Sequence, residues 1–109
     1  MDVLKEIIKT LEKNAAEDIV VLDIRGVNSV LCDYMIVATG YTSDHLISLG
    51  EKLIESFGGR FEGNEESVWV LVDLGDIIIH LFTPEAREFY ALEDLYEDAN
   101  RVEIYAEDN

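Results

Sequence analysis

The chain has 109 residues, which suits one folded domain and is too short for two independent hydrophobic cores. Lys and Arg number 8 against 24 Asp and Glu, so the formal net charge is −16, while 49% of the residues are hydrophobic. This hydrophobic share excludes a disordered acidic tail. The charge excludes direct, specific DNA binding, because phosphate backbones are bound by clustered Lys and Arg.

The apolar runs and the cysteine content of the sequence bear on the cellular compartment. No apolar run approaches the ~20 residues that span a bilayer, and the residues after Met1 lack the pattern of a secretory signal. Cys32 is the one cysteine, so neither an internal disulfide nor a cysteine metal cage is available. We therefore expect a cytoplasmic protein that does not enter a membrane.

The first half of the chain predicts two helices and two strands. Apolar residues at helical spacing indicate an amphipathic helix from Asp2 to about Asn14. Residues 18–24 and 33–39 read as strands, and the first is aliphatic on both faces, which is typical of the interior of a sheet. Residues 26–29 have turn chemistry. A second helix is expected from Thr42 and Ser43 to Phe57, closed by Gly58 and Gly59.

The second half predicts a hairpin between shorter elements. Residues 60–62 form a short strand, residues 68–73 and 76–82 form the hairpin, and a third helix runs from Thr83-Pro84 to about Tyr96. An edge strand at 101–105 and a frayed tail at 106–109 follow. The predicted fold is a single α/β (α+β) domain over residues 1–109, with a mixed β-sheet flanked by helices.

The hairpin can be given a register from its sequence. With Leu74-Gly75 as the two-residue loop, Asp73 lies opposite Asp76, and Trp69 lies opposite His80. One face is then wholly aliphatic and is expected in the core, and it consists of Val68, Val70, Val72, Ile77, Ile79 and Leu81.

The loop of this hairpin has two interpretations. Leu74 at an exposed tip between Asp73 and Asp76 resembles an apolar interface anchor with a polar rim. Alternatively, Leu74 folds back onto the domain and the two Asp side chains point into water. These residues alone leave both interpretations open.

Catalytic chemistry finds little support in the sequence. Asp73 and Asp76 suggest a magnesium site, with Asp33 as a further carboxylate, but no phosphate-binding loop accompanies them. His45 suits a helix start that bonds locally better than a general base, and His80 suits a buried strand position packed against Trp69. Cys32, without a neighbouring base, reads as a small buried residue. We predict no catalytic residues, no metal site and no cofactor.

The third helix has a packing stripe and an opposite side. Phe89, Leu92, Leu95 and Tyr96 fit the stripe. Tyr90 falls off the stripe, and we expect it, together with Arg87, to face solvent or a partner.

Four segments, in this order and at natural spacing, resemble one protein family. They are DIVVLDIRG at 18–26, CDYMIVATG at 32–40, WVLVDLGDIIIHLF at 69–82 and TPEAREFYALEDLYEDA at 83–99. On these motifs the chain resembles the ribosomal silencing factors, also called the RsfS or Iojap family. The resemblance covers roughly residues 18–99.

This resemblance implies a translational repressor without enzymatic activity. Members of the family bind the large ribosomal subunit through ribosomal protein L-fourteen and sterically block association with the small subunit when nutrients are limiting. The implied fold is similar to nucleotidyltransferases but lacks their catalytic residues. Free members often form homodimers, so a homodimer is also implied.

The resemblance also implies a partner-binding site. Trp69, Leu74 and Tyr90 match family contact residues, and Asp73 and Asp76, on either side of Gly75, would provide an acidic rim for Lys or Arg of the partner. Arg87 is assigned to the same site because, like Tyr90, it is expected to face solvent or a partner.

Two positions depart from the family pattern. Asp44 stands where the family usually has arginine, which puts partner contacts at that helix start in doubt, and Tyr96 stands where tryptophan is common.

Two other functions remain as alternatives. They are a divergent metal-dependent nucleotidyltransferase that uses Asp73 and Asp76, and a generic acidic adaptor for another protein.

Overall fold

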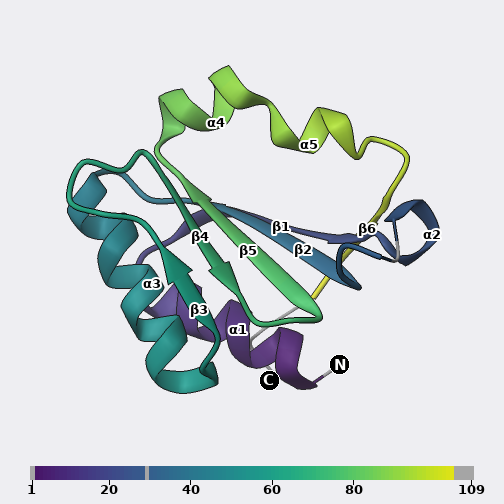
Figure 1. Ribbon diagram of the computed structural model, residues 1–109, viewed down its shortest axis with the longest axis horizontal. Helices are drawn as coiled ribbons and strands as arrows, with labels where there is room; N and C mark the ends of the chain where they lie inside the picture. Colours follow the sequence, from purple (N-terminus) through teal and green to yellow (C-terminus); the bar gives the residue numbers. More distant parts are fainter. Residues whose placement is uncertain (1, 29, 105–109) are drawn as a thin grey trace.

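The computed structural model describes residues 2–28 and 30–104, and six strands in this part of the chain form one mixed sheet (Figure 1). The strand order is β3-β4-β5-β2-β1-β6. The helices are α1 (Asp2–Lys13), α2 (Arg25–Asn28), α3 (Ser43–Phe57), α4 (Pro84–Tyr90) and α5 (Leu92–Leu95). The strands are β1 (Glu17–Asp23), β2 (Tyr34–Thr39), β3 (Arg60–Glu62), β4 (Trp69–Asp73), β5 (Ile77–Phe82) and β6 (Asn100–Val102). In these described residues, no helix is long and apolar enough to cross a membrane.

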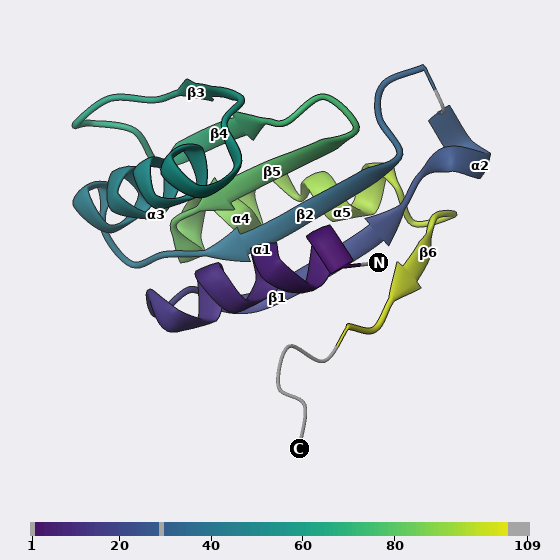
Figure 2. The same cartoon turned by 90° about the horizontal axis from the view of Figure 1, so that it is seen from below.

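A parallel pair of strands occupies the centre of the sheet. β2 pairs with β5 in parallel from Tyr34 opposite Ile77 to Thr39 opposite Phe82, and every residue of both strands is buried. On either side, β1 pairs with β2 and β4 pairs with β5 in antiparallel fashion. Parallel strands need cover on both faces. Figures 1 and 2 show α1 and α3 on one face of the sheet and α4 and α5 on the other.

Most predicted elements are confirmed. The helix expected near Asp2 is α1, the interior strands are β1 and β2, and the short strand is β3. Thr42 caps α3 by accepting a hydrogen bond from the His45 amide at 3.0 Å, and Gly58 closes the same helix with a φ of 76°. The predicted edge strand is present as β6, but it covers Asn100–Val102, and the expected tail at 106–109 lies outside the described residues.

Two predicted elements differ from the structure. The segment expected to be a turn contains the short helix α2, and its residue 29 is not described. The single third helix is wrong, because Ala91 adopts a left-handed conformation (φ 45°) that separates α4 from α5. The Ala91 amide donates to the Arg87 carbonyl at 3.0 Å and thereby closes α4. The chain can then change direction before α5.

The predicted hairpin register is also wrong. β4 and β5 pair with Trp69 opposite Phe82 and Asp73 opposite Ile78, so the two-residue loop is Gly75-Asp76. Gly75 has a φ of 94° at the first position of this loop. A side chain disfavours that conformation, so glycine rather than leucine takes the position. The shift changes the partners but keeps every side chain on its predicted face, because side chains alternate with a period of two.

The aliphatic face of the hairpin forms part of the first core. Val70, Val72, Ile77, Ile79 and Leu81 are buried against residues of α1 and α3, as predicted. Val68 was predicted to join them but is 45% exposed, because it precedes β4. There its carbonyl accepts a hydrogen bond from the Thr83 amide.

The opposite face of the hairpin is covered as well. Ile78 and Phe82 form a second core with Ala86 of α4, and Trp69 and Leu92 pack against it. His80 is 6% exposed, and its Nδ1 accepts a hydrogen bond from Trp69 Nε1 at 3.0 Å. The buried strand histidine packed against Trp69 is therefore confirmed, and burial lowers the pKa of His80 to about 4.

Gly50 of α3 tests the contact between this helix and β3. A Cβ at Gly50 would clash with the ring carbons of Phe61, whereas a Cβ at the helical Gly26 would meet open space. We expect Gly50→Ala to lower the free energy of unfolding by ~1–3 kcal/mol, despite the helix propensity of alanine. Gly26→Ala, the matched control, should leave stability unchanged or slightly raised. Urea denaturation measures both, and equal effects would show that Phe61 does not pack as described.

The buried His80 predicts a specific pH dependence of stability. Its folded pKa of about 4 lies below the ordinary value of 6.5, so the unfolded chain binds a proton between these values that the folded chain does not. The neutral, buried His80 therefore contributes to the free energy of unfolding in full above pH 6.5. This contribution is lost as the pH falls towards 4, by at most ~3 kcal/mol. His80→Gln retains an acceptor for Trp69 but cannot titrate in this range. The stability advantage of the wild type over this variant should shrink from pH 7 to pH 4.5, and a constant difference in chemical denaturation would contradict the assignment.

Candidate partner-binding surface

The residues predicted to bind a partner do not form one surface. They lie in a hairpin turn, in an aromatic cluster beside α4, and in a polar pocket between α4 and the sheet. The hairpin turn consists of Asp73, Leu74, Gly75 and Asp76, the aromatic cluster contains Trp69 and Tyr90, and the polar pocket contains Arg87. Trp69 and the turn lie at opposite ends of β4, and Trp69 and Leu74 pack against different cores.

Leu74 is not the exposed knob predicted from the sequence. Its amide donates to the Ile77 carbonyl at 2.9 Å, so the residue continues the ladder of the hairpin. This position directs the side chain to the aliphatic face, where it is partly buried and packs against the first core. The alternative interpretation, in which Leu74 folds back onto the domain, is the one that the structure supports.

The carboxylates of the turn have separate environments. Asp73 Oδ1 accepts a hydrogen bond from the Gly75 amide at 2.8 Å, and its Oδ2 lies 3.5 Å from Arg60 Nη2. Asp76 is exposed, and its carbonyl accepts hydrogen bonds from the amides of Asp33 (2.8 Å) and Tyr34 (3.1 Å). The predicted cross-strand pairing of Asp73 with Asp76 is therefore wrong. In the described part of the chain, no group of three or more His, Cys, Asp or Glu is arranged to hold a metal ion.

The aromatic cluster consists of Trp69, Phe82, Phe89 and Tyr90. The ring centroid of Trp69 lies 4.8 Å from that of Phe82 and 4.8 Å from that of Tyr90, and Phe89 meets Tyr90 edge to face at 5.1 Å. Trp69 is partly buried, whereas Tyr90 is 46% exposed, in agreement with its prediction off the core stripe. The cluster thus runs from the buried Phe82 to the surface.

Two residues of the predicted packing stripe, Phe89 and Leu95, lie at the surface instead. Phe89 and Leu95 were predicted in the core but are 80% and 73% exposed, whereas Leu92 and Tyr96 do pack against the second core. The break at Ala91 changes which side chains face the sheet. The adjacent Phe-Tyr pair was the available signal, because neighbouring helical residues cannot both face one core.

Arg87 is held within the protein rather than directed at solvent or a partner. Its guanidinium lies between Glu93 and two residues of the sheet, Asp18 and Thr39. Nε and Nη2 donate to the two carboxylate oxygens of Glu93 at 2.9 and 3.2 Å, and Nη1 donates to the Asp18 carbonyl and to Thr39 Oγ1 at 2.6 and 2.8 Å. Arg101 lies 3.7 Å from the same Glu93 carboxylate. The predicted exposure of Arg87 is therefore wrong.

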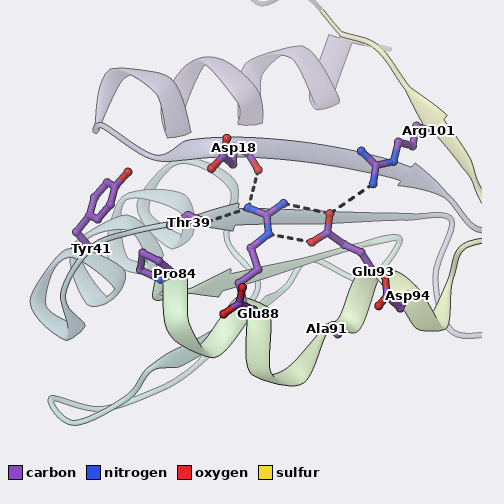
Figure 3. Close-up of a pocket in the computed structure, with 10 residues that line it drawn as sticks. Asp18, Thr39, Tyr41, Pro84, Glu88, Ala91, Glu93, Asp94 and Arg101 are labelled. Carbon is purple, nitrogen blue, oxygen red and sulfur yellow. Dashed lines mark hydrogen bonds and ion pairs between the residues drawn. The ribbon is translucent and has the colours of Figure 1, made fainter.

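This network explains how α4 and α5 are held over the sheet. Asp18 has a φ of 51° at an irregularity of β1, and Arg87 binds the carbonyl at that point. Because Glu93 is on α5 and Arg101 on β6, the network joins both helices to strands β1, β2 and β6 (Figure 3). The pocket around it, of about 500 Å³, is open to solvent and carries both signs of charge.

The other candidate residues have structural partners. His45 Nδ1 accepts from the Tyr41 amide at 3.1 Å, so Nε2 carries the proton and donates to the Asn14 carbonyl at 2.8 Å. The bond with Tyr41 is the local bonding expected of a helix-start histidine, whereas the bond to Asn14 joins the start of α3 to the residue that follows α1. Burial raises the pKa of Cys32, whose thiol donates to the Tyr34 carbonyl at 3.3 Å. Asp44 occupies the first turn of α3, where a negative charge stabilises the helix.

The whole chain is similar to one family of known proteins. The sequence model of a family described as "Ribosomal silencing factor during starvation" matches residues 1–109. A Zymomonas mobilis protein named ribosomal silencing factor RsfS is 36% identical over 99 residues, which cover 85% of this chain and 74% of the relative. A mouse protein named "Mitochondrial assembly of ribosomal large subunit protein 1" is 28% identical over 83% of this chain and 43% of its own.

A solved structure has the same architecture. The crystal structure of a Bacillus halodurans protein superposes with a TM-score of 0.78 at 28% identity, and the match covers 94% of this chain and 98% of the other. The sequence match over the full length and the shared fold agree. This chain belongs to the ribosomal silencing factor family.

Proposed function

We propose that this protein is a non-enzymatic translational repressor that binds the large ribosomal subunit through ribosomal protein L-fourteen and blocks association with the small subunit. The observation that carries the proposal is the family match over residues 1–109. The name of the mouse relative, which refers to the ribosomal large subunit, supports the same subunit as the target. Nutrient limitation is the condition in which such repression is useful to the cell.

The charge of the protein supports a basic protein partner. A net charge of −16 repels nucleic acid but attracts a positively charged protein surface, which accelerates encounter and lowers the affinity for wrong partners. Binding should therefore weaken as ionic strength rises, because salt screens exposed charges.

The aromatic cluster provides the apolar part of such a surface. Interfaces are commonly anchored by Trp, Tyr and Phe side chains surrounded by polar residues. Phe89 and Tyr90 are exposed on α4, and the partly buried ring of Trp69 packs against the ring of Tyr90. Glu85 and Glu88 are exposed on the same helix, α4, and are available to basic residues of a partner.

Repression by this protein requires no chemical step. A folded domain bound to the joining surface of the large subunit occupies space that the small subunit needs, so each bound molecule removes one subunit from association. The degree of repression then follows from affinity and concentration alone. A metal-dependent transferase would need the two turn carboxylates at one site, and Asp73 is instead engaged by Gly75 and Arg60.

Purified ribosomal subunits test the proposal directly. Large subunits are incubated with the chain, small subunits are added, and the mixture is separated on a sucrose gradient. We expect the chain to migrate with the large subunit and the peak of joined ribosomes to fall in proportion to the chain added. A chain that remains at the top of the gradient at both low and physiological salt would contradict the proposal, and would favour the acidic adaptor for another protein.

Tyr90→Ala tests the contribution of the aromatic cluster to binding. We expect the affinity for large subunits to fall by about tenfold or more, since exposed aromatic anchors at interfaces cost ~1.4 kcal/mol or more on truncation. Tyr41→Ala is the matched control, because Tyr41 is 55% exposed and lies outside the cluster. Trp69→Ala is less informative, because Trp69 also bonds His80 and supports the second core. Equal affinities of the Tyr90 and Tyr41 variants would remove the cluster from the interface.

A further inference from the structure

The turn of the hairpin borders a small apolar pocket at the end of the sheet where β2 and β5 begin. The pocket has a volume of about 250 Å³, below the ~300 Å³ at which sites for drug-sized ligands begin. Its apolar walls are Val3, Tyr34, Phe57, Leu74 and Ile77. A site of this size and lining suits one side chain better than a cofactor.

Several elements hold the walls of this pocket in place. Val3 comes from the first turn of α1 and Phe57 from the last turn of α3. Leu74 comes from the hairpin, whose Asp76 carbonyl is bonded to the amides of Asp33 and Tyr34. The pocket is therefore formed by the fold itself and does not depend on one loop.

Two carboxylates complete the lining. Asp33 is partly buried and Asp76 is exposed, and both line the pocket. Neither forms an ion pair within residues 2–28 and 30–104, while the nearby Arg25 is paired with Asp23 and Asp73 is paired with Arg60. The negative charge at the pocket is thus available to an incoming group.

Apolar walls with adjacent carboxylates match the chemistry of a long basic side chain. Lys and Arg place their methylene groups against apolar surface while the charged end bonds to carboxylates or water. A purely apolar side chain would leave the two carboxylates partly desolvated without compensation, which costs free energy.

We propose that this pocket, which we call the turn pocket, receives one arginine or lysine side chain of the basic protein partner. This inference rests on the proposed function for the partner. It joins Leu74 and Asp76, which were predicted to bind a partner, to wall residues that were not: Val3, Asp33, Tyr34, Phe57 and Ile77. The proposal also gives Leu74 a role: its inward side chain forms a wall of the turn pocket and does not act as an exposed anchor.

Affinity for large subunits tests the turn pocket with two kinds of variant. Val3→Trp fills the pocket, and Asp33→Asn with Asp76→Asn removes its charge without changing its shape. Val68→Trp, at another exposed valine, is the control for the first, and Glu51→Gln with Glu55→Gln on the exposed side of α3 is the control for the second. We expect each pocket variant to weaken binding by about tenfold or more, and each control to change it by less than about threefold.

A small probe tests the turn pocket without the ribosome. n-Butylguanidinium is compared with guanidinium and with n-butanol by amide chemical shifts of the isotope-labelled chain. We expect saturable shifts at Leu74, Asp76 and Ile77 with n-butylguanidinium at lower concentration than with either half of the molecule, and their loss in Val3→Trp. Shifts that are equal for all three probes, or that persist in Val3→Trp, would overturn the inference.

The two measurements separate failure of the inference from failure of the proposed function. If the wild type binds large subunits and the pocket variants bind equally well, the turn pocket is wrong and the proposed function stands. If the wild type does not bind large subunits, the proposed function is wrong, and the probe measurement still decides whether the pocket accepts an alkyl cation.

Discussion

β2 pairs in parallel with β5 at the centre of the sheet. This pairing joins two antiparallel units into one sheet, and all residues of both strands are buried. Both faces must therefore be covered, by α1 and α3 on one side and by α4 and α5 on the other. The β4–β5 hairpin consequently cannot present a whole face to a partner. Its turn and the outer surface of α4 are exposed, and these are the regions that we propose for recognition.

Sequence patterns predicted the fold well because burial imposes strong periodicity. The aliphatic residues of β2 and β5, and the spacing in α1 and α3, reflect two covered faces. The register of the hairpin was missed because it depends on which residue accepts a positive φ, and Gly75 does so better than Leu74. The break at Ala91 was missed because no glycine or proline lies there to indicate the end of a helix. The Arg87–Glu93 ion pair, which joins α4 to α5 across the break, stabilises this arrangement.

The candidate site was predicted less well than the fold. Family resemblance indicated Trp69, Leu74 and Tyr90. The sequence could not show how far apart these residues lie, nor that Leu74 packs against the first core and Trp69 against the second, because both depend on the tertiary fold. Arg87 was grouped with Tyr90, three residues further along the helix, but the Glu93 carboxylate and two groups of the sheet bind its guanidinium, which is a tertiary arrangement. In both proposed contact regions, negative charge lies beside apolar surface. The charge attracts a basic protein, and the apolar contacts determine how that protein is oriented.

Hydrogen exchange of the chain, free and bound to purified large subunits, decides whether the hairpin turn and α4 contact the subunit. We expect slower exchange on binding at the Gly75 amide, which is held by the Asp73 side chain at the surface, and at the end of α4 near Tyr90. Amides at residues 14–16, between α1 and β1, should exchange at the same rate in both states. Protection confined to that connection or to the exposed side of α3, with no change at the hairpin turn or α4, would show that the protein binds the subunit through another surface.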